Sequence, residues 1–360
     1  FLDDAVDFIE EMPASIVKKI LKNTDENMRK LINEFLNYPA DSAGSIMTIE
    51  YVDLKKEMTV TQAIERIKQT GIDKETINTC YVIDENRRLE GVTSIRRLIL
   101  SDEKDLLADI MNTDVIYIHT TDDQESISML FKKYDLLAMP VVDNERRLVG
   151  IITVDDIVDI IDQENTEDLY KMAAMQPSDE EYLKTGVFVL AKNRITWLLV
   201  LMLSATFTGN IIKQFEDVLK SVVILTAFIP MLMDTGGNAG SQSSTLIIRG
   251  LALGDITLND ALKVLWKEFR VSLVVGFALA GVNFLRLFYL ERINFLISVT
   301  VCTTLFLTVI LAKVVGGLLP IGAKLVKLDP AIMASPLITT IVDAFALIIY
   351  FELATTLLGI

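Results

Sequence analysis

An apolar stretch of the chain, residues 222–248, is interrupted in its middle by polar residues. Residues 230–242 read Pro-Met-Leu-Met-Asp-Thr-Gly-Gly-Asn-Ala-Gly-Ser-Gln and supply carboxylate, amide, hydroxyl and bare backbone oxygens. A stretch of this length can cross a bilayer, where such groups are tolerated only if they are buried in protein or line a water-filled path. The sequence therefore predicts that residues 230–242 form part of a pore wall.

Asp343 is a second polar group in an apolar setting, with Ile341 and Val342 before it and Ala344 after it. A lone carboxylate at membrane depth costs on the order of 3 kcal/mol on insertion scales, so it should face a cavity, a partner or an ion. No lysine or arginine at membrane depth is an obvious partner for it. A cation site is the favoured interpretation, and a protonated Asp343 hydrogen-bonded inside the protein is the alternative.

The oxygen donors at these positions favour a hard divalent cation. Asn238 adds an amide oxygen without a second charge, and the neighbouring Gly237 leaves its carbonyl bare. Hard oxygen ligands suit Mg²⁺ or Ca²⁺ better than Zn²⁺ or Cu²⁺, and Mg²⁺ keeps several waters while taking one or two carboxylates. Asp343, Asn238 and Gly237 are therefore the candidate pore ligands of a partly hydrated Mg²⁺ ion.

Asp234-Thr235-Gly236 also spells the aspartic-protease tripeptide. Asp234 and Asp343 could then share a proton and activate water, as an intramembrane protease would. A tripeptide occurs readily by chance, so we expect no enzyme, and the protease is the remote alternative.

Composition and charge divide the chain into an acidic front and an apolar back. Of the 360 residues 51% are hydrophobic and the mean hydropathy is +0.41, so part of the chain is expected in a membrane. Residues 1–190 hold 39 acidic and 21 basic side chains, a net −18, whereas residues 191–360 hold 10 and 13, a net +3. The acidic front argues against nucleic acid as a partner and in favour of cations.

Five apolar segments are long enough to span a bilayer. They lie at about 194–212, 222–248, 269–290, 295–319 and 332–358, in a membrane domain of residues 191–360. Basic residues concentrate on the side that would carry the N-terminal part. The distribution predicts a multi-pass protein of the cell membrane, in contact with lipid, with a cytoplasmic N-terminus and an external C-terminus.

An internal repeat fills residues 39–161. Residues 81–99 align with residues 140–158 at a constant offset, so that Gly91 pairs with Gly150, and each copy reads as strand, polar turn, strand, helix. This pattern resembles a tandem pair of cystathionine-beta-synthase (CBS) regulatory domains, which are α/β domains.

The resemblance to CBS pairs implies adenine-nucleotide binding, with ATP as the candidate, through a Gly-x-x-Ser/Thr-x-x-Asp end. The second copy keeps this end as Gly150, Thr153 and Asp156, whereas the first has Arg97 in place of the aspartate. The alternative is that Thr153 simply caps the helix that begins at Val154.

Two helical segments flank the repeat. Residues 1–38 have apolar residues at helical spacing and are expected to be the end of a larger helical domain. A charged connecting helix is expected at 162–190, and a solvated helix face or a cation sensor would explain the charge of the region. The acidic residues here are Asp155, Asp156, Asp159, Asp162, Glu164, Glu167 and Asp168.

With its acidic CBS pair, charged connecting helix and five spans, the chain resembles the MgtE family of magnesium channels. The most specific matches are residues 236–242 with 246–249, and residues 329–330 with 335–343. The resemblance implies an α-helical front, α/β CBS domains and an all-α five-helix membrane domain in one multidomain membrane protein.

The family resemblance also implies a homodimer with a pore on its axis and Asp343 as the central Mg²⁺ site. Its cytoplasmic sensing carboxylates carry over to Asp329 and to Asp155 or Asp156, and less closely to the connecting-helix positions Asp159, Glu164, Glu167 and Asp168. The expected function is a Mg²⁺-selective channel that cytoplasmic Mg²⁺ closes. A CBS-regulated coupled carrier for another ion, or a membrane-bound nucleotide sensor, would be the competing class.

Overall fold

The protein is described by a computed structural model that covers residues 6, 8–9, 12–178, 182–333 and 335–359. It forms two compact units, Phe1–Glu164 and Asn165–Ile360. The first unit opens with α2 (Ala14–Asn23) and α3 (Glu26–Phe35), in the region predicted to be helical. Asp25 caps α3 by accepting a hydrogen bond from the Met28 amide at 2.8 Å.

The predicted repeat is confirmed as two α/β domains of equal topology. In each, the first strand pairs parallel with the second, and the second pairs antiparallel with the third. The first copy contains β1 (Val52–Leu54), α5 (Val60–Thr70), the short η1 (Gly71–Asp73), β2 (Thr79–Ile83), β3 (Leu89–Ser94) and α6 (Ile95–Leu100). The second contains β4 (Ile118–His119), α8 (Gln124–Tyr134), β5 (Ala138–Val142), β6 (Leu148–Thr153) and the start of α9 (Val154–Met172).

Each copy is completed by a segment that precedes the other copy in the chain. The residues around α4 (Ala43–Ile46) pack into the core of the second copy, and α7 (Leu107–Ile110) packs into the core of the first. A Cβ atom at Gly150 would lie 2.8 Å from the Thr48 carbonyl oxygen, and one at Gly91 would lie 3.0 Å from that of Asn112. The repeated glycine is thus required by packing in both copies, whether or not a nucleotide binds.

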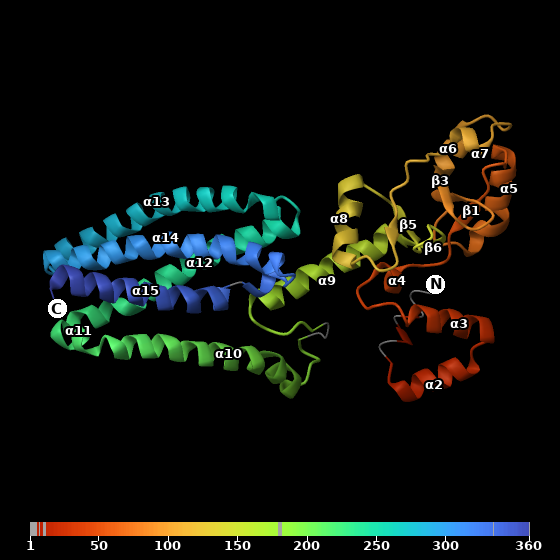
Figure 1. Cartoon of the computed structure of the whole chain (residues 1–360). Coiled ribbons are helices and arrows are strands. Elements are labelled where there is room, and N and C mark those ends of the chain that lie inside the picture. The colour runs from red at the N-terminus through yellow and green to blue at the C-terminus, as the bar shows by residue number, and fades with distance from the viewer. Residues whose placement is uncertain (1–5, 7, 10–11, 179–181, 334, 360) are drawn as a thin grey trace. The chain divides into compact units, whose positions relative to one another are not determined.

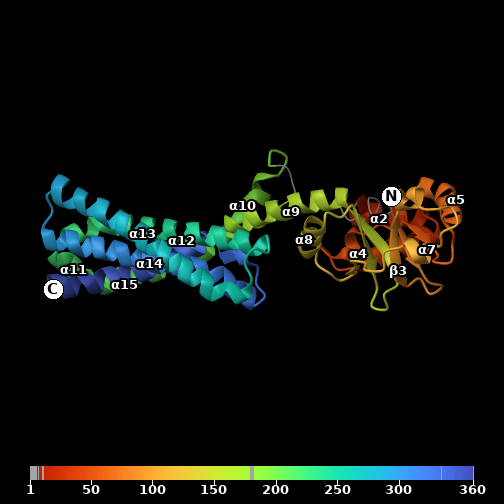
Figure 2. The same ribbon diagram turned by 90° about the horizontal axis from the view of Figure 1, so that it is seen from above.

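The expected connecting helix at 162–190 differs from the observed one. The helix α9 starts at Val154, runs without interruption and ends at Met172 (Figure 2). Ala174, with φ of 52°, has left the helical conformation, and the described residues between there and Val187 form no helix. The charged segment is therefore a long helix followed by a linker.

The second unit is a bundle of long helices (Figure 1). Its elements are α10 (Val187–Gln214), α11 (Glu216–Ser221), η2 (Val223–Phe228), α12 (Ile229–Ala252), η3 (Leu258–Asp260), α13 (Ala261–Leu285), the π-helical turn η4 (Arg286–Leu290), α14 (Phe295–Leu325), η5 (Pro330–Met333) and α15 (Ser335–Leu358). Among the described residues, four stretches are both long and apolar enough to cross a membrane: Val187–Gln214, Leu258–Leu290, Phe295–Leu325 and Ser335–Leu358.

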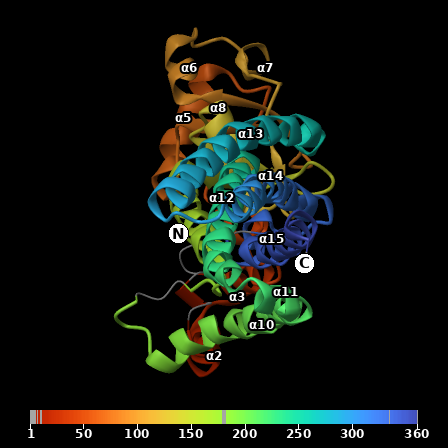
Figure 3. The same cartoon turned by 90° about the vertical axis from the view of Figure 1, so that its left-hand side faces the viewer.

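The helix α12 occupies the place of the second predicted span. It has 24 residues, enough to cross a bilayer at 1.5 Å per residue, but its centre carries the polar segment that prompted the pore hypothesis. Seen along the bundle, α12 lies beside α14 and α15, against which it packs (Figure 3).

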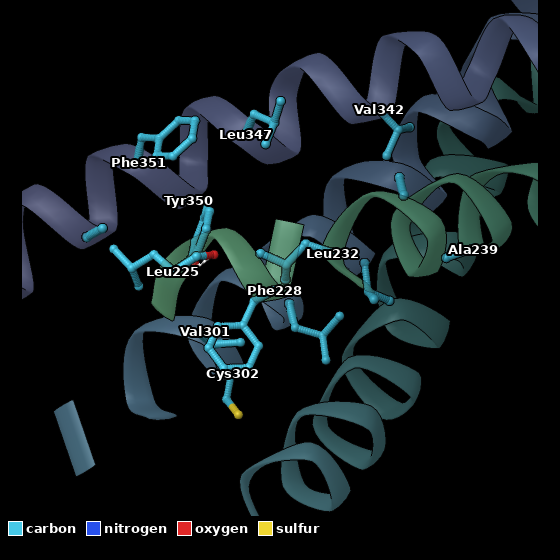
Figure 4. Packing of buried hydrophobic residues seen from close by; sticks show 14 of the residues in the cluster. Leu225, Phe228, Leu232, Ala239, Val301, Cys302, Val342, Leu347, Tyr350 and Phe351 are labelled. Atoms are coloured by element: carbon cyan, nitrogen blue, oxygen red, sulfur yellow. Dashed lines mark hydrogen bonds between the residues drawn. The ribbon is translucent and has the colours of Figure 1, made fainter. Parts of the chain in front are cut away.

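An apolar core fixes the start of α12. Leu225, Phe228 and Leu232 are buried against residues of α14 and α15 (Figure 4). The Tyr350 hydroxyl in α15 donates a hydrogen bond of 2.9 Å to the Leu225 carbonyl, which satisfies a backbone acceptor in the short turn before α12.

Glycines bring the backbone of α12 unusually close to its neighbours. A Cβ atom at Gly240 would lie 2.7 Å from a methyl carbon of Ile338 in α15, and one at Gly316 of α14 would lie 2.2 Å from the Gly240 carbonyl oxygen. Small residues permit such close approach of membrane helices. Side chains on the remaining faces of α12 are therefore placed by tight backbone contacts.

Candidate metal centre

Asp343 lies in the middle of α15, which packs along α12. Its Oδ1 atom is buried and has no hydrogen-bond partner among the described residues. The charge of Asp234 on α12 acts on this carboxylate, so the two acidic groups lie near each other. A buried carboxylate oxygen without a donor is costly in a protein and is suited to receive a cation or an ordered water.

The helix α12 presents polar side chains next to this carboxylate. Asp234 and Asn238 are one turn apart and are exposed in the single chain. Gly237 faces α15, where an added Cβ atom would lie 2.7 Å from the Thr339 methyl carbon. The structure thus brings Gly237 and Asp343 to the α12–α15 interface and leaves Asn238 exposed on α12.

Hydroxyl groups continue from Asp343 along the same interface. Ser241 and Ser335 are joined by a hydrogen bond of 2.9 Å between their Oγ atoms, and Thr339 lies between that pair and Asp343 along α15. We call this row the polar strip. It consists of Asp234, Asn238, Ser241, Ser335, Thr339 and Asp343. All six of its side chains lie inside residues 230–242 or 335–343, which the sequence singled out because polar groups are conspicuous in apolar helices.

A second acidic group gathers where α14 ends and α15 begins. Lys171 of α9 donates a hydrogen bond of 2.6 Å to Asp329 Oδ2, and it also forms an ion pair with Glu167. The other carboxylate oxygen of Asp329 accepts the Ala331 amide at 2.8 Å. Asp329 is therefore satisfied on both oxygens, by a cation and by a backbone donor.

Burial and neighbouring charges shift the pKa values of two side chains in this acidic group, Asp168 and Lys171. Burial raises the pKa of Asp168, the charges of Asp329 and Glu167 raise it further, and Lys171 opposes them. Burial lowers the pKa of Lys171, but its hydrogen bonds to Asp329 and Glu167 outweigh that effect and raise it. Lys171 stays protonated and neutralises one of three carboxylate charges.

Apolar contacts hold the same end of α9. Met172 packs against Ile248 of α12 and Ala331 of η5, both of which are buried. Because Lys171 and Met172 are adjacent, the last turn of α9 is attached by one polar and one apolar contact. Asp329, Glu167 and Asp168 were predicted from the sequence as sensing carboxylates, but Lys171 was not predicted as their partner.

The remaining predicted sensing residues lie in the first unit. Asp155 and Asp159 are exposed on α9, and Glu164 accepts a hydrogen bond of 2.6 Å from Gln124 Nε2. Asp156 accepts one of 2.7 Å from the buried Thr153 hydroxyl. The structure keeps the proposed nucleotide residues Gly150, Thr153 and Asp156 together at the junction of β6 and α9.

A buried charged group in the bundle was not predicted from the sequence. Lys313 of α14 and Glu268 of α13 are only 5% and 8% exposed, and both contact Ser243 of α12. Lys313 lies within the fourth predicted span, where a lysine in a long apolar run was a visible signal. Its described partner is Ser243, so it does not serve as the counter-ion that Asp343 lacks.

Comparison with known proteins identifies the family. The magnesium transporter MgtE of Thermus thermophilus is 38% identical over 357 residues, which cover 99% of this chain and 79% of that protein. The chain belongs to the MgtE family. The MgtE transporter of Bacillus subtilis is likewise 38% identical, over 98% of this chain and 78% of its own length.

Family profiles match the MgtE chain in three regions. The divalent cation transporter domain matches residues 229–353, CBS domains match 43–103 and 107–163, and the MgtE intracellular N domain matches 1–41. MgtE proteins are transporters and not enzymes, so the protease interpretation of Asp234 and Asp343 is not supported. The apolar helices of the second unit make the chain a multi-pass membrane protein.

Two solved structures of parts of magnesium-transport proteins are similar to part of the chain. The soluble part of a magnesium transporter is 41% identical, covers 46% of this chain and 64% of that one, and has a TM-score of 0.45. The cytosolic domain of the Mg²⁺ channel MgtE in complex with ATP is 40% identical, covers 44% and 65%, and has a TM-score of 0.43.

Proposed function

We propose that the chain forms a homodimeric channel that conducts Mg²⁺ across the cell membrane. The observation that carries this proposal is the buried Oδ1 of Asp343, which accepts no hydrogen bond from the described residues, beside the glycine-rich part of α12. Relatives named as magnesium transporters over nearly the whole chain support Mg²⁺ as the ion.

The second copy of the chain is needed to cover the polar strip. Asp234 and Asn238 are exposed on α12 of a single chain, and lipid could not satisfy them. A two-fold axis along the strip would enclose it as a water-filled path and bring two copies of Asp343 to one site. Mg²⁺ would keep most of its waters, contact the Asp343 carboxylates and be bordered by Asn238 and the Gly237 carbonyl.

Cytoplasmic Mg²⁺ closes this path in our proposal. Glu167, Asp168 and Asp329 carry three negative charges against the single charge of Lys171. Two like charges 4 Å apart repel by about 4 kcal/mol at an effective dielectric constant of 20. Bound Mg²⁺ removes that repulsion and holds α9 against η5 and α12.

Further Mg²⁺ binds in the acidic first unit. Its sites there draw on Asp155, Asp156, Asp159 and Glu164. A shift from mostly open to mostly closed requires about 5.5 kcal/mol of differential binding, which several weak sites can supply together.

The orientation of the chain follows from the same proposal. The acidic CBS domains and the N-terminus lie in the cytoplasm, where they sample Mg²⁺, and the C-terminus lies outside. ATP binds at Gly150, Thr153 and Asp156, with the Asp156 carboxylate, now paired with the Thr153 hydroxyl, turning to the ribose hydroxyls.

Flux of Mg²⁺ into liposomes tests the proposal. The wild type should conduct, Mg²⁺ on the side of the CBS domains should suppress the flux, and alanine at Asp155, Asp156 and Asp329 should weaken that suppression. Absence of any flux from folded wild-type protein would overturn the channel. Suppression that survives the triple substitution unchanged would overturn the gate and leave the channel standing.

A further inference from the structure

A buried polar cluster lies inside the bundle, apart from the polar strip. The Ser243 hydroxyl donates to Glu268 Oε2 at 2.6 Å and accepts from Lys313 Nζ at 3.3 Å. Ser243 is 1% exposed. Among the residues that the structure describes, no direct ion pair joins Glu268 to Lys313. A serine of α12 therefore connects opposite charges on α13 and α14.

Two glycines of α14 make room for this cluster. Gly316 faces the Gly240 carbonyl of α12, and Gly317 faces the stem of Glu268, whose Cγ would lie 3.2 Å from an added Cβ atom. Lys313 lies one turn before both glycines. The same turn of α14 thus provides close packing and a charge.

The helix α13 reaches α12 through this carboxylate. The backbone of α13 packs mainly along α14, and few of its residues approach α12. The Glu268 side chain bridges that gap by its bond to Ser243. The cluster is thus a polar connection between α12 and α13, in addition to the apolar cluster that Val264 of α13 shares with Ile247 and Leu251 of α12.

The cluster contacts α12 on the side away from the polar strip. With 3.6 residues per turn, Ser243 lies about 140° around the helix from Asn238 and about 180° from Asp234. A rotation of α12 that lengthened the hydrogen bonds of Ser243 would therefore turn Asp234 and Asn238 out of their places. Both faces belong to one continuous helix, so a rotation of α12 as a whole moves Ser243 and the polar side chains together.

We propose that Glu268, Ser243 and Lys313 form a positioning site that sets the rotation of α12 and thereby the placement of the pore-lining side chains. The inference rests on the proposed channel, and none of the three residues touches the ion. Charge balance is the working principle, because a buried ion left without its counter-charge is strongly unfavourable, whereas loss of both charges together is often tolerated.

Single and double substitutions separate positioning from other roles. Glu268→Gln leaves Lys313 without a counter-charge, and Lys313→Met leaves Glu268 without one. Each substitution should lower Mg²⁺ flux about tenfold, which corresponds to an interaction energy in the range usual for residues in contact. The double variant removes both charges and should regain flux to within about threefold of wild type. Asp260 and Lys263 at the start of α13 form an ion pair of 2.7 Å outside this cluster, with the lysine exposed and the aspartate half-buried, and they provide the matched control. Asp260→Asn with Lys263→Met should leave flux unchanged.

A second measurement does not depend on Mg²⁺. Asn238→Cys provides a thiol on the polar strip, whereas the native Cys80 and Cys302 are buried. Its rate of modification by a charged methanethiosulfonate reagent in liposomes reports the orientation of α12. The rate should change several-fold in each single charge variant, return in the double variant, and stay at its original value in the Asp260 and Lys263 control.

The outcomes are distinguishable. Folded single variants with wild-type flux and wild-type modification rates would overturn the positioning site. A double variant as impaired as the two single variants combined would also overturn it, because charge balance would then not matter. If the wild type carries no Mg²⁺ but the modification rates follow the predicted pattern, the channel proposal fails and the positioning site stands.

Discussion

Asp343 and Asp329 are two aspartates of the same helix bundle with opposite surroundings. No described residue donates a hydrogen bond to the buried Oδ1 of Asp343, and its charged neighbour is another acid, Asp234. Asp329 has both oxygens occupied, by the Lys171 ammonium and the Ala331 amide. The first carboxylate is free to receive an ion, whereas the second already connects two parts of the protein.

This difference assigns separate roles in the proposed channel. A conducted ion needs a ligand whose oxygen is not already occupied by a protein donor, and it must bind weakly enough to dissociate again. A carboxylate without a protein partner therefore suits conduction. A gate must connect a moving element to the pore, and Asp329 joins the last turn of α9 to η5. Substitutions at the two residues should therefore affect different measured quantities.

Asp343→Asn should have the largest effect. It keeps the size of the side chain and removes the charge, and we expect Mg²⁺ flux to fall on the order of a hundredfold. Such a loss corresponds to about 2.8 kcal/mol, which is within the roughly 4 kcal/mol available between unit charges at 4 Å. Flux into liposomes measures it. Glu352→Gln is the matched control, because Glu352 is an exposed carboxylate about half a turn around α15 from Asp343. Equal losses from both substitutions would mean that Asp343 has no special part in conduction.

Asp329→Asn should change regulation and spare conduction. It weakens the bond to Lys171 and removes a proposed Mg²⁺ ligand, and we expect these two losses to outweigh the relief of carboxylate repulsion and so favour the open state. The Mg²⁺ concentration that halves the flux should rise about tenfold, while the flux at low Mg²⁺ stays near that of wild type. Asp255→Asn, an exposed carboxylate near the same end of the bundle, should leave both quantities unchanged. If maximal flux falls while the Mg²⁺ concentration that halves the flux stays the same, Asp329 acts in the pore and does not differ in role from Asp343.

Asp234→Asn should lie between these cases. Asp234 is exposed and one turn from Asn238, so water screens its charge more than that of Asp343. We expect a decrease in flux of about threefold, or roughly 0.7 kcal/mol, that grows as ionic strength is lowered. An effect as large as that of Asp343→Asn would show that the two carboxylates act as one site.

Local sequence patterns were sufficient to predict elements whose signals repeat or stand out. The repeated strand, turn, strand and helix predicted both CBS copies, and polar residues in apolar spans predicted the α12–α15 face. The end of the connecting helix was predicted wrongly, because the charged pattern continues past Met172 while the helix does not. Period alone does not show where tertiary contacts stop supporting a helix.

Pairings between distant residues could not be predicted in the same way. Lys171 and Asp329 are 158 positions apart, and Ser243 and Lys313 are 70 apart, so only the folded bundle brings them together. Gly150 was assigned to a nucleotide motif, yet its contact with Thr48 gives it a packing role that Gly91 shares in the first copy. A motif within one segment identifies a residue type, but it does not identify the residues from other segments that this residue contacts in the fold.

Asp168→Asn should have the smallest effect and an identifiable dependence on pH. Because burial and the charges of Asp329 and Glu167 raise the pKa of Asp168 above its ordinary 3.8, the folded protein binds more protons than the unfolded chain just above that pH. Its stability therefore falls as pH rises through that interval, and near pH 7 the ionised carboxylate carries the full penalty. Asparagine removes this penalty, so the variant should melt slightly higher than wild type at pH 7, by less than about 3 °C, and the difference should shrink toward pH 4.

Thermal unfolding in chelator, without Mg²⁺, measures this difference in melting temperature. Asp162→Asn, on an exposed part of α9, is the comparison. If the variant instead melts lower than wild type at pH 7 in chelator, the Asp168 carboxylate stabilises the end of α9 through Lys171. Asp168 would then resemble Asp329, whose carboxylate is paired with Lys171, and would differ from Asp343.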